Sequence, residues 1–349
     1  MSKLSDFIVD GVIENCDLSQ KSFMSESFAN LRLRGVNLSQ ANLTGCDFSR
    51  ADLEKCDLSF ANLTGANLTQ ASLNQCKLAG AQMQNTRCMA TKFSDSDLTG
   101  ILAEKAIWQM STFVTCVLDE AQFSGADCEF ISALSSSFKG VDLTGAVISR
   151  ATFQSCDLSE VVFQDTEMAQ TLLIKAKLTG QRFPGCQFDT TVFSEADLTG
   201  ADFARTTLSS VIFAEANLTH SQFNGAQCDQ VIFSLANMTG ANLEGAQFEL
   251  CDFQLTKLAQ AKAARSAWQN CNLERLDAPN TDFAGAKFKF CELSKADVHA
   301  SDFTQASFTA SILFDLIENE TCWEDAQFDN SPKLDIPRAK AEQWSPPAE

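Results

Sequence analysis

Apolar residues recur at every fifth position of this chain. From Ile8 to Leu313, the 62 positions of this register are apolar or small, without an insertion or a deletion. The few without a large side chain are Cys88, Ala103, Cys128, Ala133, Cys228, Ala263 and Ala278. A period of five fits neither the 3.6 residues of an α-helical turn nor the two-residue alternation of a strand. The pattern therefore predicts a repeating backbone unit of five residues, whose register residues we call central positions.

A second rule concerns the neighbours of the central positions. The residue two before each one, here called the small position, is nearly always Ala, Cys, Ser, Thr or Val, as at Ala41 and Cys46. The residue between them is usually polar, as at Asn42 and Asp47. All of the 16 glycines except Gly11 lie two residues after a central position, where a chain that turns a corner benefits from lacking a Cβ. We therefore expect two inward positions and one corner in each repeat.

Residues 41–70 read as tandem copies of A-(D/N)-L-x-x, and this motif resembles the pentapeptide repeat family over about nine-tenths of the chain. The resemblance implies an all-β fold, a right-handed quadrilateral parallel β-helix with four pentapeptides in each coil. The register favours the same fold independently, because a unit that cannot bury its apolar face alone must stack on copies of itself. We expect one elongated solenoid of about fifteen coils with about 4.8 Å between stacked strands.

The ends of the register set the expected domain boundaries. Residues 1–15 are predicted to form an N-terminal cap with the first irregular repeats, 16–315 the β-helix, 316–331 a C-terminal cap, and 332–349 a proline-rich flexible tail. An open β-helix end exposes strand edges that must be covered. The sequence therefore predicts a monomer or a C-terminal homodimer, and the residues expected to form the cap or the dimer contact are Phe314, Leu316, Ile317, Trp323 and Phe328.

Charge limits the classes of partner. The net charge is −19, and phosphate binding needs clustered Lys and Arg, so we expect no direct binding of nucleic acid. The chain has no basic stretch followed by an apolar run at its start and no 18 consecutive apolar residues. These observations predict a cytoplasmic protein without membrane contact, with secretion by a leaderless route as the alternative.

Candidate chemistry is sparse. Ten of the 14 cysteines occupy small positions, three occupy central positions, and only Cys322 occupies neither. Cysteines separated by four pentapeptides, such as Cys56 and Cys76, would form a straight column and not a tetrahedral site, so they are interpreted as small apolar core residues. His220 and His299, the only histidines, lie at outward positions far apart. We expect no metal, no cofactor and no catalytic residues, hence no enzyme.

Two tryptophans occupy equivalent positions of the repeat. Trp108 and Trp268 are central positions of one face, separated by a whole number of coils, and each follows an alanine central position, Ala103 and Ala263. We interpret the spacing as an internal duplication of about eight coils, with the alanines compensating for the volume of the indole rings. The alternative is that a tryptophan points outward as a hot spot for a partner.

The register also assigns each residue to one of four faces. The face of Leu18 and Leu38 is the most negative, with ten acids and four bases through residue 315. On this face, the candidate partner-binding residues are Asp97, Asp119, Glu120, Asp157 and Glu160.

The predicted function is a rigid, non-catalytic scaffold that binds another protein through one face. Two alternatives remain. One is a DNA mimic that protects or inhibits a type II topoisomerase, as the resemblance to the quinolone-resistance branch of the family implies. The other is an accessory or effector-associated component of a bacterial secretion system of the type VI kind.

Overall fold

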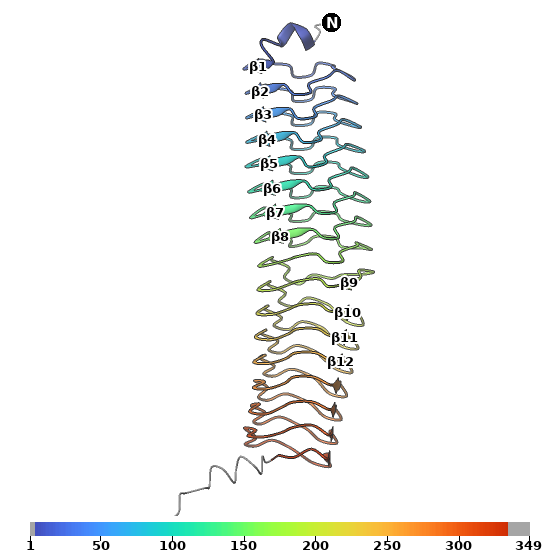
Figure 1. Cartoon of the computed structure of the whole chain (residues 1–349), viewed down its shortest axis with the longest axis vertical. Coiled ribbons are helices and arrows are strands. Elements are labelled where there is room, and N and C mark those ends of the chain that lie inside the picture. Colours follow the sequence, from blue (N-terminus) through green and yellow to red (C-terminus); the bar gives the residue numbers. More distant parts are fainter. Residues whose placement is uncertain (1–3, 334–349) are drawn as a thin grey trace, which may run out of the picture. The chain divides into compact units, whose positions relative to one another are not determined.

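The computed structural model describes residues 4–333. The chain divides into two compact units, Met1–Val192 and Phe193–Glu349, and Figure 1 shows the labelled strands following one another in chain order. Each unit is a stack of short parallel strands. The only helical segment within residues 4–333 is the short 3-10 helix η1 (Leu4–Phe7), and no helix there is long and apolar enough to cross a bilayer.

The first unit contains one sheet of eight strands in chain order. Neighbouring strands pair in parallel with an offset of four pentapeptides, so that Leu33 pairs with Leu53 and Leu53 with Leu73. The strands are β1 (Val12–Glu14), β2 (Arg32–Arg34), β3 (Asp52–Glu54), β4 (Ser72–Asn74), β5 (Lys92–Ser94), β6 (Thr112–Val114), β7 (Ser132–Leu134) and β8 (Thr152–Gln154).

The second unit repeats this organisation. Its strands β10 to β16 are paired in parallel with the same offset, as between Leu208 and Cys228. The strands are β10 (Thr207–Ser209), β11 (Gln227–Asp229), β12 (Gln247–Glu249), β13 (Ala267–Gln269), β14 (Lys287–Lys289), β15 (Ser307–Thr309) and β16 (Gln327–Asp329). The two-residue strand β9 (Phe188–Asp189) lies within the residues of the first unit.

The other three faces of each coil stack through single parallel bridges. In the first unit these bridges join Asn42 to Asn62, Asp47 to Asn67, and Asp57 to Lys77, always with the offset seen between the strands. Four pentapeptides therefore make one coil in both units. This arrangement confirms the predicted quadrilateral parallel β-helix.

Central and small positions fill the core of each unit. Central side chains such as Leu33 and Phe203 are fully buried, as are small residues such as Ala41. Aromatic rings from successive coils stack directly, for example Phe213 on Phe233 with ring centroids 5.2 Å apart. Burial of this kind contributes about 25 cal/mol for each Å² of apolar surface, which favours the stacked coil over the separate repeat.

The corners and the polar positions explain the rest of the repeat motif. Residues two after the central positions adopt positive φ, and most of them are not glycine, as at Gln40 (φ 57°) and Arg50 (φ 57°). The Asp or Asn before a central position accepts a hydrogen bond from the amide two residues later, as Asn37 Oδ1 does from the Ser39 nitrogen at 3.0 Å. The polar residue therefore stabilises the start of each corner.

The three-residue strands are followed by a characteristic small residue. The small position after each strand holds Cys, Ser, Thr or Val and never Ala, although Ala dominates the other faces. After β3 and β4, the Cys56 thiol lies 3.4–3.5 Å from the carbonyls of Leu33 and Glu54, and the Cys76 thiol lies 3.4–3.5 Å from those of Leu53 and Asn74, so each S–H can donate to either carbonyl. These cysteines thus supply donors as well as filling space.

The strands occupy different faces in the two units. In the first unit, three-residue strands carry the central positions of the face of Ile13 and Leu33, whereas in the second, they carry those of the face of Leu208 and Cys228. Trp268 therefore lies within β13, but Trp108 lies outside any strand. If a block of eight coils had been duplicated, both copies should carry their three-residue strands on the same face. The strands therefore do not repeat with the spacing of the two tryptophans. Both indole rings are buried, which contradicts the outward-facing alternative.

The described chain continues the repeat beyond residue 315. β16 pairs in register with β15, and Ile317 and Cys322 bridge the preceding coil at Asp297 and Asp302. The amide of Leu313 donates to the Pro332 carbonyl at 3.1 Å. Residues 316–331 thus have the geometry of a further coil. Most of the predicted proline-rich tail lies outside the described residues.

Candidate protein-binding surfaces

The five predicted acids lie on one face of the first unit. Asp97, Val117, Ser137 and Asp157 are successive partners in the bridges of that face, and Asp119, Glu120 and Glu160 follow its central positions. The stacking of coils therefore brings these acids, which are distant from one another in the sequence, onto neighbouring coils.

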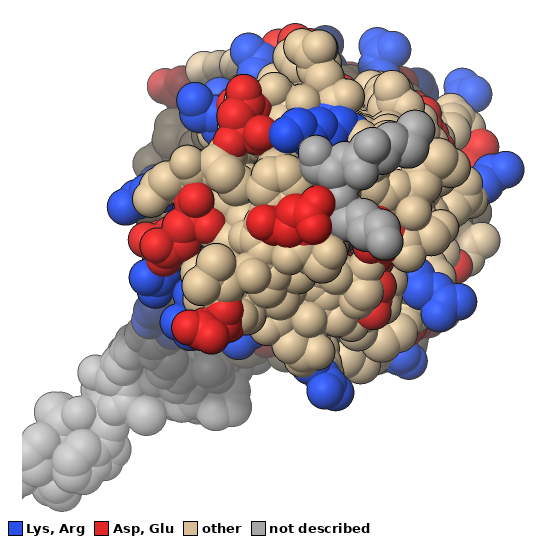
Figure 2. Space-filling view, turned by 90° about the horizontal axis from the view of Figure 1, so that it is seen from above, with Lys and Arg blue, Asp and Glu red and all other residues tan. Residues whose placement is uncertain are grey.

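Basic and apolar side chains interrupt this acidic face. Lys139 Nζ lies 3.7 Å from Glu160, and Lys177 Nζ lies 3.3 Å from Asp157. Val117 stands exposed in the column of bridges between Asp97 and Asp157. Figure 2, which views the molecule from above, shows both Lys or Arg and Asp or Glu side chains on the surface seen from that end. The face carries mixed charge and not a continuous row of carboxylates.

Hydrogen bonds keep the Asp157 carboxylate ionised. Burial raises the pKa of this carboxyl, but donation from the Ser159 side chain and amide and from Lys177 outweighs burial and leaves the pKa below its ordinary value. The Ser159 hydroxyl lies 2.6 Å from Asp157 Oδ1. Asp97 has the same arrangement with Thr99, whose hydroxyl also lies at 2.6 Å. These carboxylates therefore accept hydrogen bonds that stabilise the corners, in addition to any contact they make with a partner.

Sequence reasoning did not identify the apolar side chains that stand exposed at corners. Met110 is 58% exposed and Phe130, one coil further, is 43% exposed, with φ near 60° at both. The Arg150 guanidinium lies over the Phe130 ring at 5.2 Å and pairs with Glu129 at 2.8 Å. In the second unit, Leu235 and Leu255 are likewise exposed on neighbouring coils. The sequence signal that could have identified them is a large apolar residue two positions after a central position.

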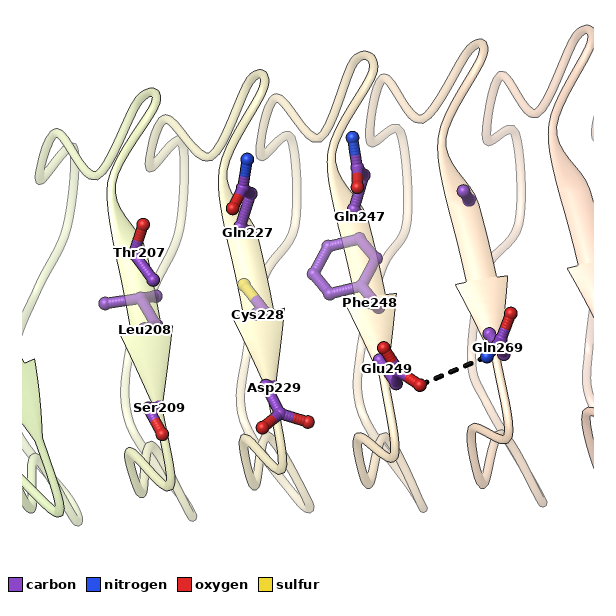
Figure 3. Close-up of a pocket in the computed structure, with 11 residues that line it drawn as sticks. Thr207, Leu208, Ser209, Gln227, Cys228, Asp229, Gln247, Phe248, Glu249 and Gln269 are labelled. Atoms are coloured by element: carbon purple, nitrogen blue, oxygen red, sulfur yellow. Dashed lines mark hydrogen bonds between the residues drawn. The ribbon is translucent and has the colours of Figure 1, made fainter.

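A shallow groove follows the outer surface of β10–β13 in the second unit (Figure 3). Its volume is about 410 Å³. Two rows of outward side chains line it, one before and one after the central positions, with Leu208, Cys228 and Phe248 between the rows. The rows contain Thr207, Gln227, Gln247 and Ala267, and Ser209, Asp229, Glu249 and Gln269.

The five predicted C-terminal residues lie at the end of the described coils. Phe314, Leu316 and Trp323 are partly exposed, whereas Ile317 and Phe328 are exposed by 49% and 41%. Trp323 and Phe328 stack on Phe303 and Phe308 of the preceding coil with centroids 4.5 and 5.1 Å apart. Lys333 also contacts this pair, with its Nζ 3.8 Å from the centre of the Trp323 ring. Whether they form a cap or a dimer contact stays a prediction.

The residues considered for chemistry remain apart. His220 is exposed at a corner. His299 lies on a different coil from His220 and contacts Asp297 of its own repeat, with Nδ1 2.7 Å from Oδ1. Within residues 4–333, no three His, Cys, Asp or Glu side chains are placed to hold one metal ion. Burial raises the pKa of the Cys46 thiol to about 11 and that of Cys88 to about 12, which disfavours the thiolate.

Family models recognise the repeat along most of the chain. A model for pentapeptide repeats matches eight copies at residues 32–70, 61–100, 135–165 and 269–305, and a model for a pentapeptide repeat region matches 167–243. Together these matches cover more than half of the sequence. No curated protein matches the chain.

Several solved structures are similar to this chain. HetL, a pentapeptide repeat protein involved in heterocyst differentiation regulation in the cyanobacterium Nostoc sp. strain PCC 7120, is 20% identical over 75% of this chain and 89% of its own, with a TM-score of 0.24. QnrB1, a plasmid-mediated fluoroquinolone resistance protein, is 15% identical over 68% and 93%, with a TM-score of 0.21. A pentapeptide repeat protein of the Arabidopsis thaliana thylakoid lumen is 32% identical over 26% and 64%, with a TM-score of 0.26.

The family assignment rests on the repeat models and on the coil of four pentapeptides that both units share. The chain belongs to the pentapeptide repeat family.

Proposed function

We propose that this protein is a non-catalytic scaffold that binds another protein through the outward side chains of its coils. The observation that carries the proposal is the exposure of large apolar side chains on neighbouring coils, as at Met110 with Phe130 and at Leu235 with Leu255. These corner side chains are not part of the buried core. Grouped exposed apolar residues among polar neighbours are typical of surfaces that bind proteins.

The acidic face of the first unit receives a secondary role in this proposal. Asp119, Glu120 and Glu160 can orient a partner through electrostatic complementarity, which affects association more than final affinity. A DNA mimic needs a dense row of negative charge, because duplex DNA carries one charge per about 1.7 Å. Lys139 and Lys177 lie among the acids of this face, so it supports the topoisomerase alternative poorly.

Affinity capture with corner variants tests the proposal. The full chain, M110S/F130S and L235S/L255S are each exposed to lysate of the source organism, and captured proteins are quantified by mass spectrometry. The matched control is Q20S/Q40S, because Gln20 and Gln40 are polar corners on neighbouring coils with the same positive φ.

We expect one specific protein to be enriched by the wild type and the control and to be reduced with at least one apolar-corner variant. Circular dichroism verifies that every variant is folded. The proposal is wrong if no protein is enriched by the folded wild type or if all variants capture the same proteins equally.

The oligomeric state remains a proposal as well. The exposed Ile317 and Phe328 support either a local cap or a contact with a second copy through the C-terminal end. A solution mass by light scattering separates these cases. A dimer mass that F328S converts to a monomer supports the contact, whereas a monomer mass for the wild type rejects it.

A further inference from the structure

One face of the second unit combines charge of both signs with exposed apolar side chains. On β11 and β12, Asp229 and Glu249 point outward in the groove of Figure 3. On β14, Lys287 and Lys289 are both exposed on the same face. Phe290 follows them at the corner. The face therefore presents acids at one end and bases at the other.

The acids have local hydrogen-bond partners but no described salt bridge. Glu249 Oε1 accepts from Gln269 Nε2 at 3.1 Å, and Asp229 Oδ2 accepts from Gln230 Nε2 at 3.3 Å. Lys289 Nζ lies 5.2 Å from the Phe290 centroid. Within residues 4–333, no salt bridge links these acids to Lys287 or Lys289. The charges are thus separated along the face and remain accessible to a partner.

The adjoining corner supplies two apolar contacts. Leu250 and Phe290 lie two coils apart, and each is 52% exposed. Leu250 directly follows Glu249, and Phe290 directly follows Lys289. Each apolar side chain therefore lies beside a charged one, in a row parallel to the row of charges.

The spacing of these residues matches an α-helix. Stacked strands lie about 4.8 Å apart, so Asp229 and Glu249 are separated by about 4.8 Å and Asp229 and Lys289 by about 14 Å along the stack. A helix rises about 1.5 Å per residue. Positions i and i+4 of a helix are therefore about 6 Å apart along the axis, and positions i and i+11 are about 16 Å apart. The three side chains lie within a sector of about 40° around the helix axis, so they face the same side.

The apolar row fits the same helix. Positions i+3 and i+10 are separated by about 10.5 Å, close to the two-coil distance of about 9.6 Å between Leu250 and Phe290. Both positions lie about 60–80° to one side of position i. A single helix can therefore place charged residues over one row and apolar residues over the other.

We propose that the face formed by Asp229, Glu249, Lys287 and Lys289, with the edge of Leu250 and Phe290, binds an amphipathic α-helix of a partner protein. That helix carries basic residues at i and i+4, an acidic residue at i+11, and apolar residues at i+3 and i+10. This inference rests on the proposed scaffold function and names its surface and the class of its partner. Charge complementarity sets the register, and the apolar contacts supply the anchors.

A designed peptide tests the inference. The probe is a stapled helix with Arg at i and i+4, Leu at i+3 and i+10, and Glu at i+11, and the control is the same helix with the charges exchanged. Binding to the full chain is measured by fluorescence anisotropy. The protein variants are D229K/E249K, L250S/F290S and the distant control Q20S/Q40S.

We expect saturable binding of the probe to the wild type and to Q20S/Q40S. D229K/E249K and L250S/F290S should each weaken this binding by about tenfold or more, and D229K/E249K should bind the charge-exchanged helix better than the probe. Equal binding of the two helices to the wild type, or unchanged binding by both variants, would overturn the inference, as would a mass measurement showing that a second copy occupies this face.

Lysate capture separates this inference from the scaffold function. If D229K/E249K and L250S/F290S still capture the protein that the wild type captures, the assigned face is wrong while the scaffold function stands. If the wild type captures nothing, the scaffold function itself fails.

Discussion

Trp268 donates its indole Nε1–H to the Ser266 hydroxyl at 2.7 Å, two residues earlier in the same repeat. The equivalent position before Trp108 is Ala106, and the Trp108 Nε1 is buried without a hydrogen-bond partner among the described residues. The two indole rings thus occupy similar apolar surroundings but differ in one hydrogen bond. A buried donor without a partner costs about 1–3 kcal/mol.

Replacing Ala106 by Ser should therefore stabilise the first unit. The new hydroxyl would lie where Ser266 lies relative to Trp268, and we expect about 1 kcal/mol of added stability. The measurement is urea unfolding monitored by tryptophan fluorescence. S266A is the reciprocal variant and should lose a similar amount. A loss of stability in A106S would show that the core has no room for the hydroxyl.

Inward and outward positions should respond differently to charge. Leu143 and Phe203 are at most 4% exposed, so L143D and F203D would bury an unpaired carboxylate and should cost more than about 4 kcal/mol. N62D is the control, because Asn62 Oδ1 already accepts from the Thr64 amide at 3.0 Å and a carboxylate can do the same. Thermal melts followed by circular dichroism should show a large change for the first two only. Equal shifts in melting temperature for all three variants would refute the assignment of inward and outward positions.

Thiol chemistry should be confined to the last described coil. Cys322 is exposed, whereas most of the other thiols are buried, and burial raises the pKa of Cys46 to about 11. We expect one rapid alkylation per native chain, located at Cys322 by peptide mass spectrometry and abolished in C322S. Reductants and metal chelators should leave the melting temperature unchanged. Rapid labelling of Cys56 or Cys271 would contradict the core assignment.

Acid should destabilise the fold through its corner carboxylates. Burial raises the pKa of Asp142, but hydrogen bonds from Ser124 and Thr144 outweigh it and hold the pKa below its ordinary value. A lowered folded-state pKa contributes stability above the unfolded-state pKa of about 4, and this stability is lost as the pH falls through the folded-state value. The melting temperature should thus fall below about pH 4, and less steeply in D142N. An identical acid profile for D142N and wild type would show that this carboxylate does not contribute.

The parallel coil of four pentapeptides was implied by the resemblance to the pentapeptide repeat family, and the five-residue register itself was sufficient to predict the stacking of repeats, the buried central positions and the corners. Each of these follows from local composition that repeats many times, as at Leu33, Ala41 and Gly45. The face that carries three-residue strands was not predicted, although residues such as Cys56 and Ser96 at the following small position mark it. Their hydroxyl and thiol hydrogen bonds become visible only when successive coils are stacked.

The candidate surface was harder to predict for a physical reason. Counting charges on a face assigned Asp119 and Glu160 to one surface, but the register alone could not show that Lys139 pairs with Glu160. Exposed Phe130 and Leu250 were missed because apolar residues were assumed to point inward. At a corner with positive φ the side chain points outward whatever its polarity, so geometry and not composition decides exposure.

The salt dependence of partner binding tests the scaffold account most directly. The affinity of the captured partner is measured between about 0.05 and 0.5 M salt, where the screening length falls severalfold, for the wild type, M110S/F130S, L235S/L255S and D119N/E120Q. We predict a shallow salt dependence and a marked loss of affinity in at least one apolar-corner variant, M110S/F130S or L235S/L255S. A steep salt dependence together with loss of binding only in D119N/E120Q would contradict the account and favour a mimic of DNA.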